Sequence, residues 1–219
     1  AEPYHNFSVS DYETLAEIAL RTIVSENKVP VICGGTGFYI NSLLFNFGYG
    51  NAAANEAVRL KYQKYVEEYG KEALYEKLKE VDFATAEKLH FNDVKRVIRA
   101  LEIYESTGVR KSEQNDELTP KRKYFAFAVN YKREDLYDRI NTRVDEMFSC
   151  GLVEEVESLI SRGIDEKYQC MQAIGYKEVL FGLKNGHNRS TMCDIIKQNT
   201  RRYAKRQITF FKKLPGLIW

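Results

Sequence analysis

The chain has 219 residues, 44% of them hydrophobic, and a formal net charge of +2. This length suffices for a buried core and fits one domain, or one domain with a small insertion, and the composition excludes a disordered chain. No apolar run reaches the roughly 18 residues that a membrane-spanning helix needs, and residues 1–5 lack the basic and apolar regions of a signal peptide. We therefore expect no membrane partner.

The four cysteines are widely spaced and form no C-x-x-C pair, which favours reduced thiols in a cytoplasmic protein. The three histidines show no metal-ligand spacing, so no metal site built from protein side chains is expected. A magnesium ion held by phosphates would leave no such pattern in the sequence.

The first fifty residues have the order helix, strand, glycine turn, helix. A Ser-x-x-Glu capping box at 10–13 predicts a helix over 11–27, and the apolar run 29–33 predicts a strand buried on both faces. The glycine turn at 34–37 precedes a further expected helix over 38–44. This order predicts an α/β fold with a parallel sheet.

The middle of the chain, residues 51–91, is rich in Glu, Lys, Tyr and Leu and predicts a helical insertion. We expect residues 1–50 and 92–219 to form the α/β core around it. Asn92 and Asp93 cap a strongly periodic helix within that core, and Gly108 ends it.

The last hundred residues alternate between a strand and helices. The pattern predicts a strand over 124–130, helices over 133–148 and 152–161, and a basic helix after the turn at 182–188. From Thr191 to Lys213 seven cations face Asp194 alone, a local charge of about +6. This placement of charge suits a polyanion with stackable parts, although a solvated amphipathic helix would have the same pattern.

Two pairs of cations stand four residues apart on predicted helices. Lys95 and Arg99 share a face near the start of one helix, where they oppose the helix dipole. A bound anion would explain them, and so would ion pairing of Arg99 with Asp93 or Glu102. Arg139 and Arg143 form the second pair, which suits a di- or triphosphate because each guanidinium binds phosphate oxygens bidentately. Asp145 and Glu146 are the alternative partners of this second pair.

The glycine turn at 34–37 follows a predicted strand and opens a helix, so its backbone N–H groups offer a place for an anion or a polar edge. It lacks the Lys-Ser/Thr of a Walker A loop and the spacing of a dinucleotide fingerprint. A purely structural turn is the alternative. The neighbouring phenylalanines Phe210 and Phe211 are expected mainly in the core, because two adjacent side chains of a helix cannot both face a ligand.

Six segments together resemble the tRNA dimethylallyltransferase (tRNA isopentenyltransferase) family, in the family's order and spacing. They include Gly-Gly-Thr-Gly-Phe-Tyr, Arg-Val-Ile-Arg-Ala-Leu-Glu and Gln-Ala-Ile-Gly-Tyr-Lys-Glu. The segments are 7–12, 30–39, 92–102, 139–147, 172–178 and 201–210.

The resemblance implies a fold like that of P-loop nucleotide kinases with a helical insertion. It implies transfer of a dimethylallyl group from dimethylallyl diphosphate to N6 of the adenosine 3′ of the anticodon in tRNA, with that adenosine flipped into a channel and Mg²⁺ as cofactor. By motif, Arg139 and Arg143 would hold the diphosphate leaving group. The residues that would contact the anticodon stem-loop are Thr36, Arg59, Lys95, Arg96, Arg99, Gln172, Gly175, Tyr176, Lys177, Lys205, Arg206, Gln207, Thr209 and Lys212.

One departure from the family pattern concerns the catalytic base. In the family, the P-loop and the aspartate that acts as base toward the adenine N6 lie on the N-terminal side of what is here Ala1. We therefore assign no catalytic residue and expect residues 1–219 alone to be inactive in transfer. We also expect the chain to be a monomer. Three alternatives remain: a noncatalytic tRNA-binding form, an adenylate isopentenyltransferase, and a small-molecule nucleotide kinase. The insertion and the basic helix favour tRNA as acceptor.

Overall fold

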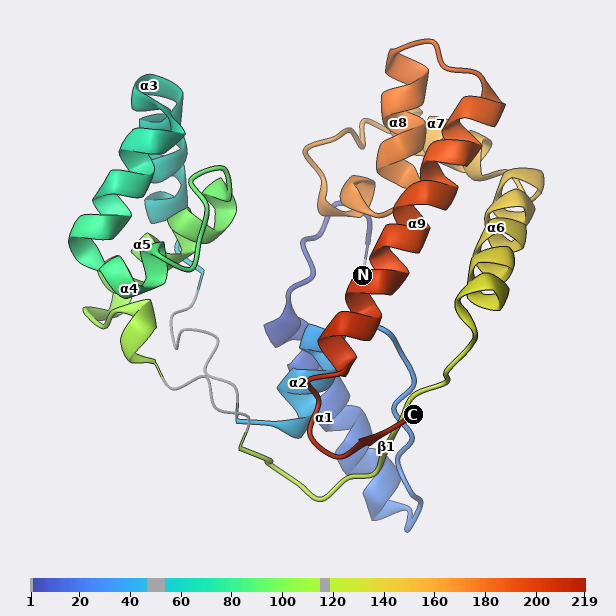
Figure 1. The fold of residues 1–219 in the computed structure, drawn as a ribbon, viewed down its shortest axis with the longest axis horizontal. Helices are drawn as coiled ribbons and strands as arrows, with labels where there is room; N and C mark the ends of the chain where they lie inside the picture. Colours follow the sequence, from blue (N-terminus) through green and yellow to red (C-terminus); the bar gives the residue numbers. More distant parts are fainter. Residues whose placement is uncertain (1, 47–53, 115–118) are drawn as a thin grey trace. The chain divides into compact units, whose positions relative to one another are not determined.

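A computed structural model describes residues 2–46, 54–114 and 119–219 (Figure 1). The chain divides into two compact units. Unit 1 comprises Ala1–Leu44 and Lys121–Trp219, and unit 2 comprises Phe45–Pro120. In both units helices dominate, and none of the helices in the described part of the chain is long and apolar enough to cross a membrane.

Unit 1 begins with α1 (Val9–Ser25), which packs against α2 (Gly37–Leu44). The N-terminal cap of α1 is Ser8: its hydroxyl accepts a hydrogen bond from the Asp11 N–H, and the Asp11 carboxylate accepts one from the Ser8 N–H. The expected capping box at residues 10–13 is therefore wrong by two residues. The Ser8-x-x-Asp11 pair has the same spacing and caps the helix first.

The apolar run at residues 29–33 is not a strand in the structure. Val29 and Val31 are each 85% exposed, so the expectation of a strand buried on both faces is wrong for the described residues. A parallel strand is buried only between hydrogen-bonded neighbours, and no other segment that the structure describes pairs with this one.

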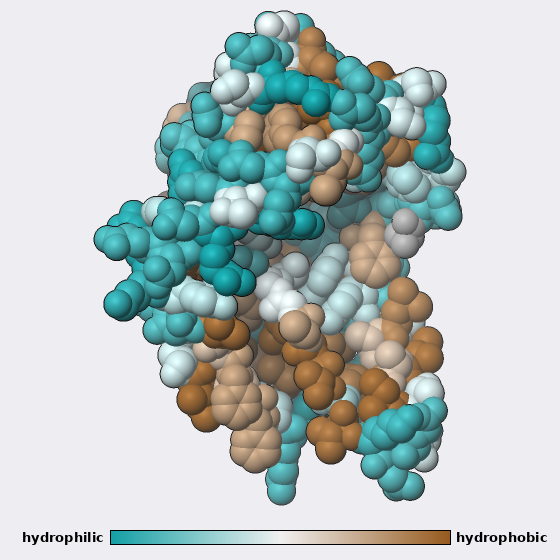
Figure 2. Space-filling view, turned by 90° about the vertical axis from the view of Figure 1, so that its right-hand side faces the viewer, coloured by the Kyte–Doolittle hydropathy of each residue, from teal (hydrophilic) through white to brown (hydrophobic). Residues whose placement is uncertain are grey.

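A two-stranded parallel sheet is the only sheet in the described ranges. It joins β1 (Ala126–Phe127) to β2 (Leu217–Ile218), with Ala126 opposite Leu217. The strand expected over 124–130 is thus confirmed for two residues, and the part of the chain that the structure describes does not contain the full parallel sheet of a kinase-like core. One face of this segment is exposed, since Phe125, Phe127 and Val129 are 91%, 73% and 79% exposed. Apolar side chains gather on this part of unit 1 in Figure 2.

Four helices complete unit 1: α6 (Arg133–Ser149), α7 (Leu152–Ser161), α8 (Tyr176–Lys184) and α9 (Arg189–Phe211). Their positions confirm the helices expected over 133–148 and 152–161 and the basic helix after 188. A short 3₁₀ helix, η2 (Gln169–Gln172), precedes α8. The apolar faces of these elements form one core, in which Val156, Met171 and Val179 are fully buried.

Unit 2 is built on α3 (Glu56–Val81), which is broken at Gly70, where φ is 85°. It packs against α5 (Val94–Thr107), and the short helices α4 (Phe83–Ala86) and η1 (Lys111–Glu113) lie beside them. As expected, Gly108 ends α5, with a left-handed φ of 71°. The unit extends to Pro120, whereas the insertion was expected to end at residue 91. The difference arises because the apolar face of α5 is buried against α3.

Candidate functional site

A groove of about 1040 Å³ lies in unit 1 against α6, η2 and α9. Each of these elements contributes polar side chains to a largely apolar lining. The residues that line it include Arg139, Arg143, Met147, Gln172, Ile174, Thr200 and Tyr203. The structure therefore brings the predicted diphosphate-binding arginines and Gln172, a predicted RNA contact, to one groove.

Arg139 and Arg143 are exposed, and helical spacing directs both toward this groove. The Arg139 guanidinium lies 4.9 Å from the centroid of the Tyr131 ring, a cation–π contact that leaves its N–H groups available. Arg143 Nη1 lies 3.5 Å from Glu146 Oε2, and both side chains are more than half exposed. An exposed ion pair of this length contributes little to stability, so it competes weakly with a bound anion.

Asp145, the other alternative partner of the two arginines, turns to α9 instead. Its Oδ1 lies 2.6 Å from Lys197 Nζ and accepts a hydrogen bond from Cys193 Sγ at 3.3 Å. The hydrogen bond with Lys197 lowers the pKa of Asp145, while burial and then Asp145 raise the pKa of the Cys193 thiol. Asp145 thus links α6 to α9, and its carboxylate forms no ion pair with Arg139 or Arg143 among the described residues.

The segment that leads from η2 into α8 is held by a buried carboxylate. Gly175 has a φ of 101°, and its N–H donates to Glu178 Oε2 at 2.7 Å. Asn199 Nδ2 of α9 donates to Glu178 Oε1 at 2.8 Å. Glu178 and Asn199 were not among the site residues expected from the sequence, although a Glu three residues after a glycine at a helix start has the spacing of a cap.

The predicted RNA contacts in this segment differ in whether their polar groups already form hydrogen bonds or ion pairs within the protein. The Tyr176 hydroxyl donates to Glu155 Oε1 at 2.7 Å, and burial, followed by this bond, raises the pKa of Tyr176 to about 12. Gln172 Nε2 donates to the Glu166 carbonyl at 2.7 Å, but the residue is exposed. Lys177 is also exposed, and its Nζ lies 3.6 Å from Glu178 Oε1.

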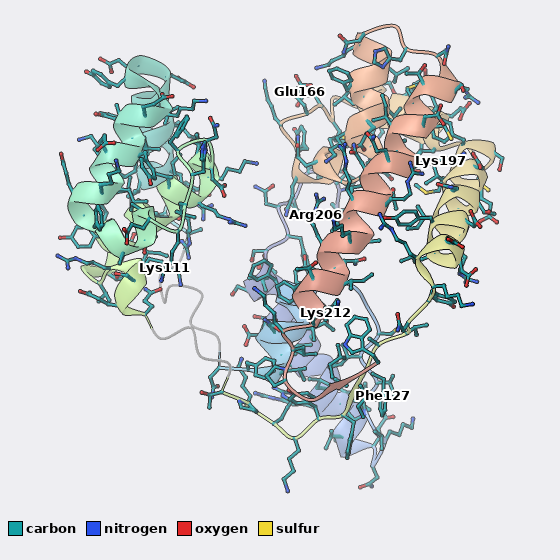
Figure 3. The ribbon with its side chains drawn as sticks, in the orientation of Figure 1. Lys111, Phe127, Glu166, Lys197, Arg206 and Lys212 are labelled. Atoms are coloured by element: carbon teal, nitrogen blue, oxygen red, sulfur yellow. The ribbon has the colours of Figure 1, made fainter. Side chains whose placement is uncertain are left out.

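One side of α9 presents cations that have no carboxylate partner among the described residues. Arg202, Lys205, Arg206 and Lys212 are all exposed, and none forms an ion pair in the ranges that the structure covers. Figure 3 shows Lys197, Arg206 and Lys212 following one another along this helix. The Thr209 hydroxyl donates to the Lys205 carbonyl at 2.9 Å and so is used within the helix.

The opposite side of α9 packs against the glycine turn. Gln207 Nε2 donates to the Gly35 carbonyl at 2.8 Å, and a Cβ atom at Gly37 would overlap the Phe210 ring. This close approach explains why glycines are needed at 35 and 37, whereas Thr36 between them is exposed. The ring centroids of Phe210 and Phe38 lie 5.6 Å apart, so Phe210 packs against α2. Phe210 and Phe211 are only half-buried and lie outside the buried core, so the expectation that they lie mainly in the core is not confirmed.

In unit 2, two of the predicted RNA contacts bind a buried acid. Glu102 is fully buried; its Oε1 lies 2.9 Å from Arg59 Nε, and its Oε2 lies 2.8 Å from Arg99 Nη1. Burial alone would raise the pKa of Glu102, but hydrogen bonds from Arg99 and from the Asn55 N–H, together with Arg59, outweigh it and lower the pKa. Ion pairing of Arg99 is thereby confirmed.

The remaining cations of α5 are exposed. Arg96 Nη1 lies 3.3 Å from Asp93 Oδ2, so Asp93 pairs with Arg96 and the acid bound by Arg99 is Glu102. Lys95 has no ion pair among the residues that the structure covers. Within residues 2–46, 54–114 and 119–219, no three His, Cys, Asp or Glu side chains gather as a metal site.

Known proteins resemble this chain along its length. The family model described as IPP transferase matches residues 1–214. The chain is 42% identical to the tRNA dimethylallyltransferase of Acetivibrio thermocellus, over 99% of this chain and 70% of that protein. It is also 42% identical to the tRNA dimethylallyltransferase of Thermoanaerobacter sp. strain X514, over 100% of this chain and 71% of that protein.

Solved structures agree with these relatives. The full-length tRNA isopentenylpyrophosphate transferase of Bacillus halodurans matches with a TM-score of 0.67 and 37% identity, covering 100% of this chain and 68% of that one. A eukaryotic dimethylallyltransferase acting on tRNA matches with a TM-score of 0.78 and 28% identity, covering 98% and 56%. The likeness that the motifs indicated is confirmed, and this chain belongs to the IPP transferase family, the family of the tRNA dimethylallyltransferases.

Proposed function

We propose that this chain acts in tRNA modification, in the transfer of a dimethylallyl group from dimethylallyl diphosphate to N6 of the adenosine 3′ of the anticodon. In this reaction the bond between the allylic carbon and the diphosphate oxygen breaks, and a bond from N6 to that carbon forms. The diphosphate leaves and N6 loses a proton. Membership of the IPP transferase family and 42% identity to a tRNA dimethylallyltransferase support the proposal.

The role of Arg139 and Arg143 in this proposal is to bind the diphosphate. Negative charge develops on the diphosphate as the allylic bond breaks, and fixed guanidinium groups stabilise that charge. Both arginines line the groove and hold no strong ion pair among the described residues, so they are available for this role. The apolar part of the lining, which includes Met147 and Ile174, suits a five-carbon chain.

The role of α9 is to bind the RNA backbone. Lys205, Arg206 and Lys212 are exposed cations without carboxylate partners in the described ranges, on the helix that also contributes Thr200 and Tyr203 to the groove. This run of charge without carboxylate partners is the observation that carries the proposal, because cations clustered along one helix are the electrostatic pattern that binds a nucleic-acid backbone. Lys95, Arg96 and the two arginines on Glu102 would add RNA contacts from unit 2.

Magnesium enters the proposal only through family membership. When bound with the diphosphate it would supply positive charge to the leaving group, and no described side chain is assigned to hold it. Likewise, no described residue is assigned as the base that receives the N6 proton.

The proposal is tested by measuring what residues 1–219 bind. We expect a fluorescent anticodon stem-loop to bind with a Kd that rises steeply with KCl, dimethylallyl diphosphate to bind by calorimetry, and AMP to compete with neither. Preference for AMP over the stem-loop would favour an adenylate isopentenyltransferase. Salt-sensitive RNA binding without diphosphate affinity would favour a noncatalytic RNA-binding form.

A second arm separates the two sites. Arg139→Gln with Arg143→Gln should weaken diphosphate binding about tenfold or more, since each charged hydrogen bond contributes about 1.5–3 kcal/mol, and should spare the affinity for the stem-loop. Equal loss of both affinities would remove the role assigned to these arginines.

A further inference from the structure

Glu102 of unit 2 is a buried carboxylate that organises groups from two helices. It lies on α5 and accepts from Arg99 of the same helix at 2.8 Å and from Arg59 of α3 at 2.9 Å. Its third donor is the Asn55 N–H, at 2.7 Å, and Asn55 itself caps α3. A single acid therefore fixes the start of α3 and two guanidinium groups at once.

The two arginines remain partly accessible in this arrangement. Glu102 has no exposed side-chain surface, while 35% of the Arg59 side chain and 31% of the Arg99 side chain stay exposed. Glu56, which also lies 3.1 Å from Arg59, is 83% exposed and therefore holds it weakly. Glu102 and Glu56 together balance the charges of Arg59 and Arg99, but the pair with Glu56 is exposed and weak, so a phosphate can replace Glu56 and cannot replace the buried Glu102.

We propose that Glu102 is a positioning residue for RNA binding, which holds Arg59 and Arg99 together in the rotamers that contact backbone phosphates. This inference rests on the proposed function and adds to it the group that orients two of the RNA contacts. A free arginine loses side-chain freedom when it binds a phosphate, and one already fixed by a buried acid loses less. The bidentate geometry of a guanidinium makes this orientation matter more than it would for lysine.

Two roles of Glu102, as a counter-charge only or as a positioning residue, predict opposite effects of Glu102→Gln on RNA binding. Glu102→Gln raises the net charge by one, so if the acid were only a counter-charge, the variant would bind the anticodon stem-loop more tightly. If Glu102 positions the arginines, the variant binds about fivefold more weakly in spite of the added charge, which corresponds to the ordering cost of one side chain. The sign of the change in Kd decides between the two.

Glu105 provides a matched control on the same helix. Its carboxylate also binds donors of α3, Lys61 at 2.6 Å and the Tyr62 hydroxyl, but no arginine. Glu105→Gln adds the same charge, and we expect unchanged or slightly tighter binding. Equal weakening by Glu105→Gln and Glu102→Gln would show a general effect of disturbing α3 and α5, and would overturn the proposal.

The experiment measures stem-loop binding by anisotropy across a KCl series, with residues 1–219 and at a temperature where circular dichroism shows each variant folded. If Glu102→Gln does not fold, Arg59→Lys and Arg99→Lys test the same point, since each keeps its charge and loses the guanidinium fork; binding as tight as that of the unaltered protein would overturn the proposal. Tighter binding by a folded Glu102→Gln overturns it as well. Failure of the unaltered protein to bind RNA would instead count against the proposed function.

Discussion

Two basic helices of this chain look alike in sequence and differ in structure. Both α5 and α9 carry cations four residues apart, and both were expected to contact RNA. On α5, Arg96 and Arg99 bind Asp93 and Glu102. On α9, Lys205, Arg206 and Lys212 have no such partner in the ranges that the structure describes.

The difference follows from where the acids lie. On α5 an acid lies three residues from each of these arginines, within reach on the helix surface. On α9 the stretch from Thr191 to Lys213 contains one acid, Asp194, near its start. The spacing of cations alone therefore does not identify an anion site; the acids one turn away decide whether the charge remains available.

The largest expected effect concerns the stability of unit 2. Glu102→Ala leaves Arg59 and Arg99 without their buried counter-charge and the Asn55 N–H without its acceptor, which should lower the free energy of unfolding by about 3–5 kcal/mol. Lys205→Ala on α9 should change it by less than about 0.5 kcal/mol. Urea unfolding followed by NMR signals of each unit measures both. Equal effects would remove the contrast between the two helices.

A second prediction concerns the packed side of α9. Gly37→Ala places a Cβ on the Phe210 ring and should cost about 1–3 kcal/mol through overpacking. Gly34→Ala is its control, because a Cβ there meets nothing within 4 Å. Thermal unfolding of the two variants gives the comparison. If Gly34→Ala costs as much as Gly37→Ala, the glycines serve the turn itself and not its contact with α9.

A third prediction concerns the exposed side of α9. Replacing Lys205 and Arg206 together with Gln should weaken stem-loop binding about tenfold at moderate salt and lower the slope of log Kd against log salt by about 1.5, since each phosphate contact contributes about 0.7–0.9 to it. Replacing Lys197 with Gln is the control, because Asp145 already neutralises it. An unchanged slope in the double variant would place these cations in a structural role.

The elements that the sequence predicted well are those whose signals are local. The helix that contains Arg139 and Arg143, and the basic helix that ends near Phe211, follow from 3.6-residue periodicity and from glycine or asparagine at their ends. The run at residues 29–33 was mispredicted because a strand depends on partners elsewhere in the chain, which an apolar run does not specify.

In the candidate site, too, contacts within one helix could be predicted from the sequence. The approach of Arg139 and Arg143 follows from their spacing on one helix, and Arg99 with Glu102 was open as an ion pair. Contacts between distant segments were not predictable: Arg59 with Glu102, and Asn199 with Glu178, each join two helices. Such contacts depend on tertiary packing, which no local pattern contains.

The smallest expected effect is the pH dependence of unit 2. The pKa of Glu102 is lower in the folded protein than its ordinary value near 4.3, so its contribution to stability is complete above that value and is lost as the pH falls through the lowered pKa. Unit 2 should therefore take up protons when it unfolds below about pH 4. Glu102→Gln removes one titrating group and should reduce that uptake by at most one proton, and Asp82 and Glu105, whose pKa values are also lowered, account for uptake that remains. Urea midpoints between pH 3 and 6 measure the uptake. Lys205, Arg206 and Lys212 of α9 bind no carboxylate in the described ranges, so the same acidification should leave the charge on these three side chains unchanged. A pH-dependent loss of stability confined to unit 1 would contradict the comparison.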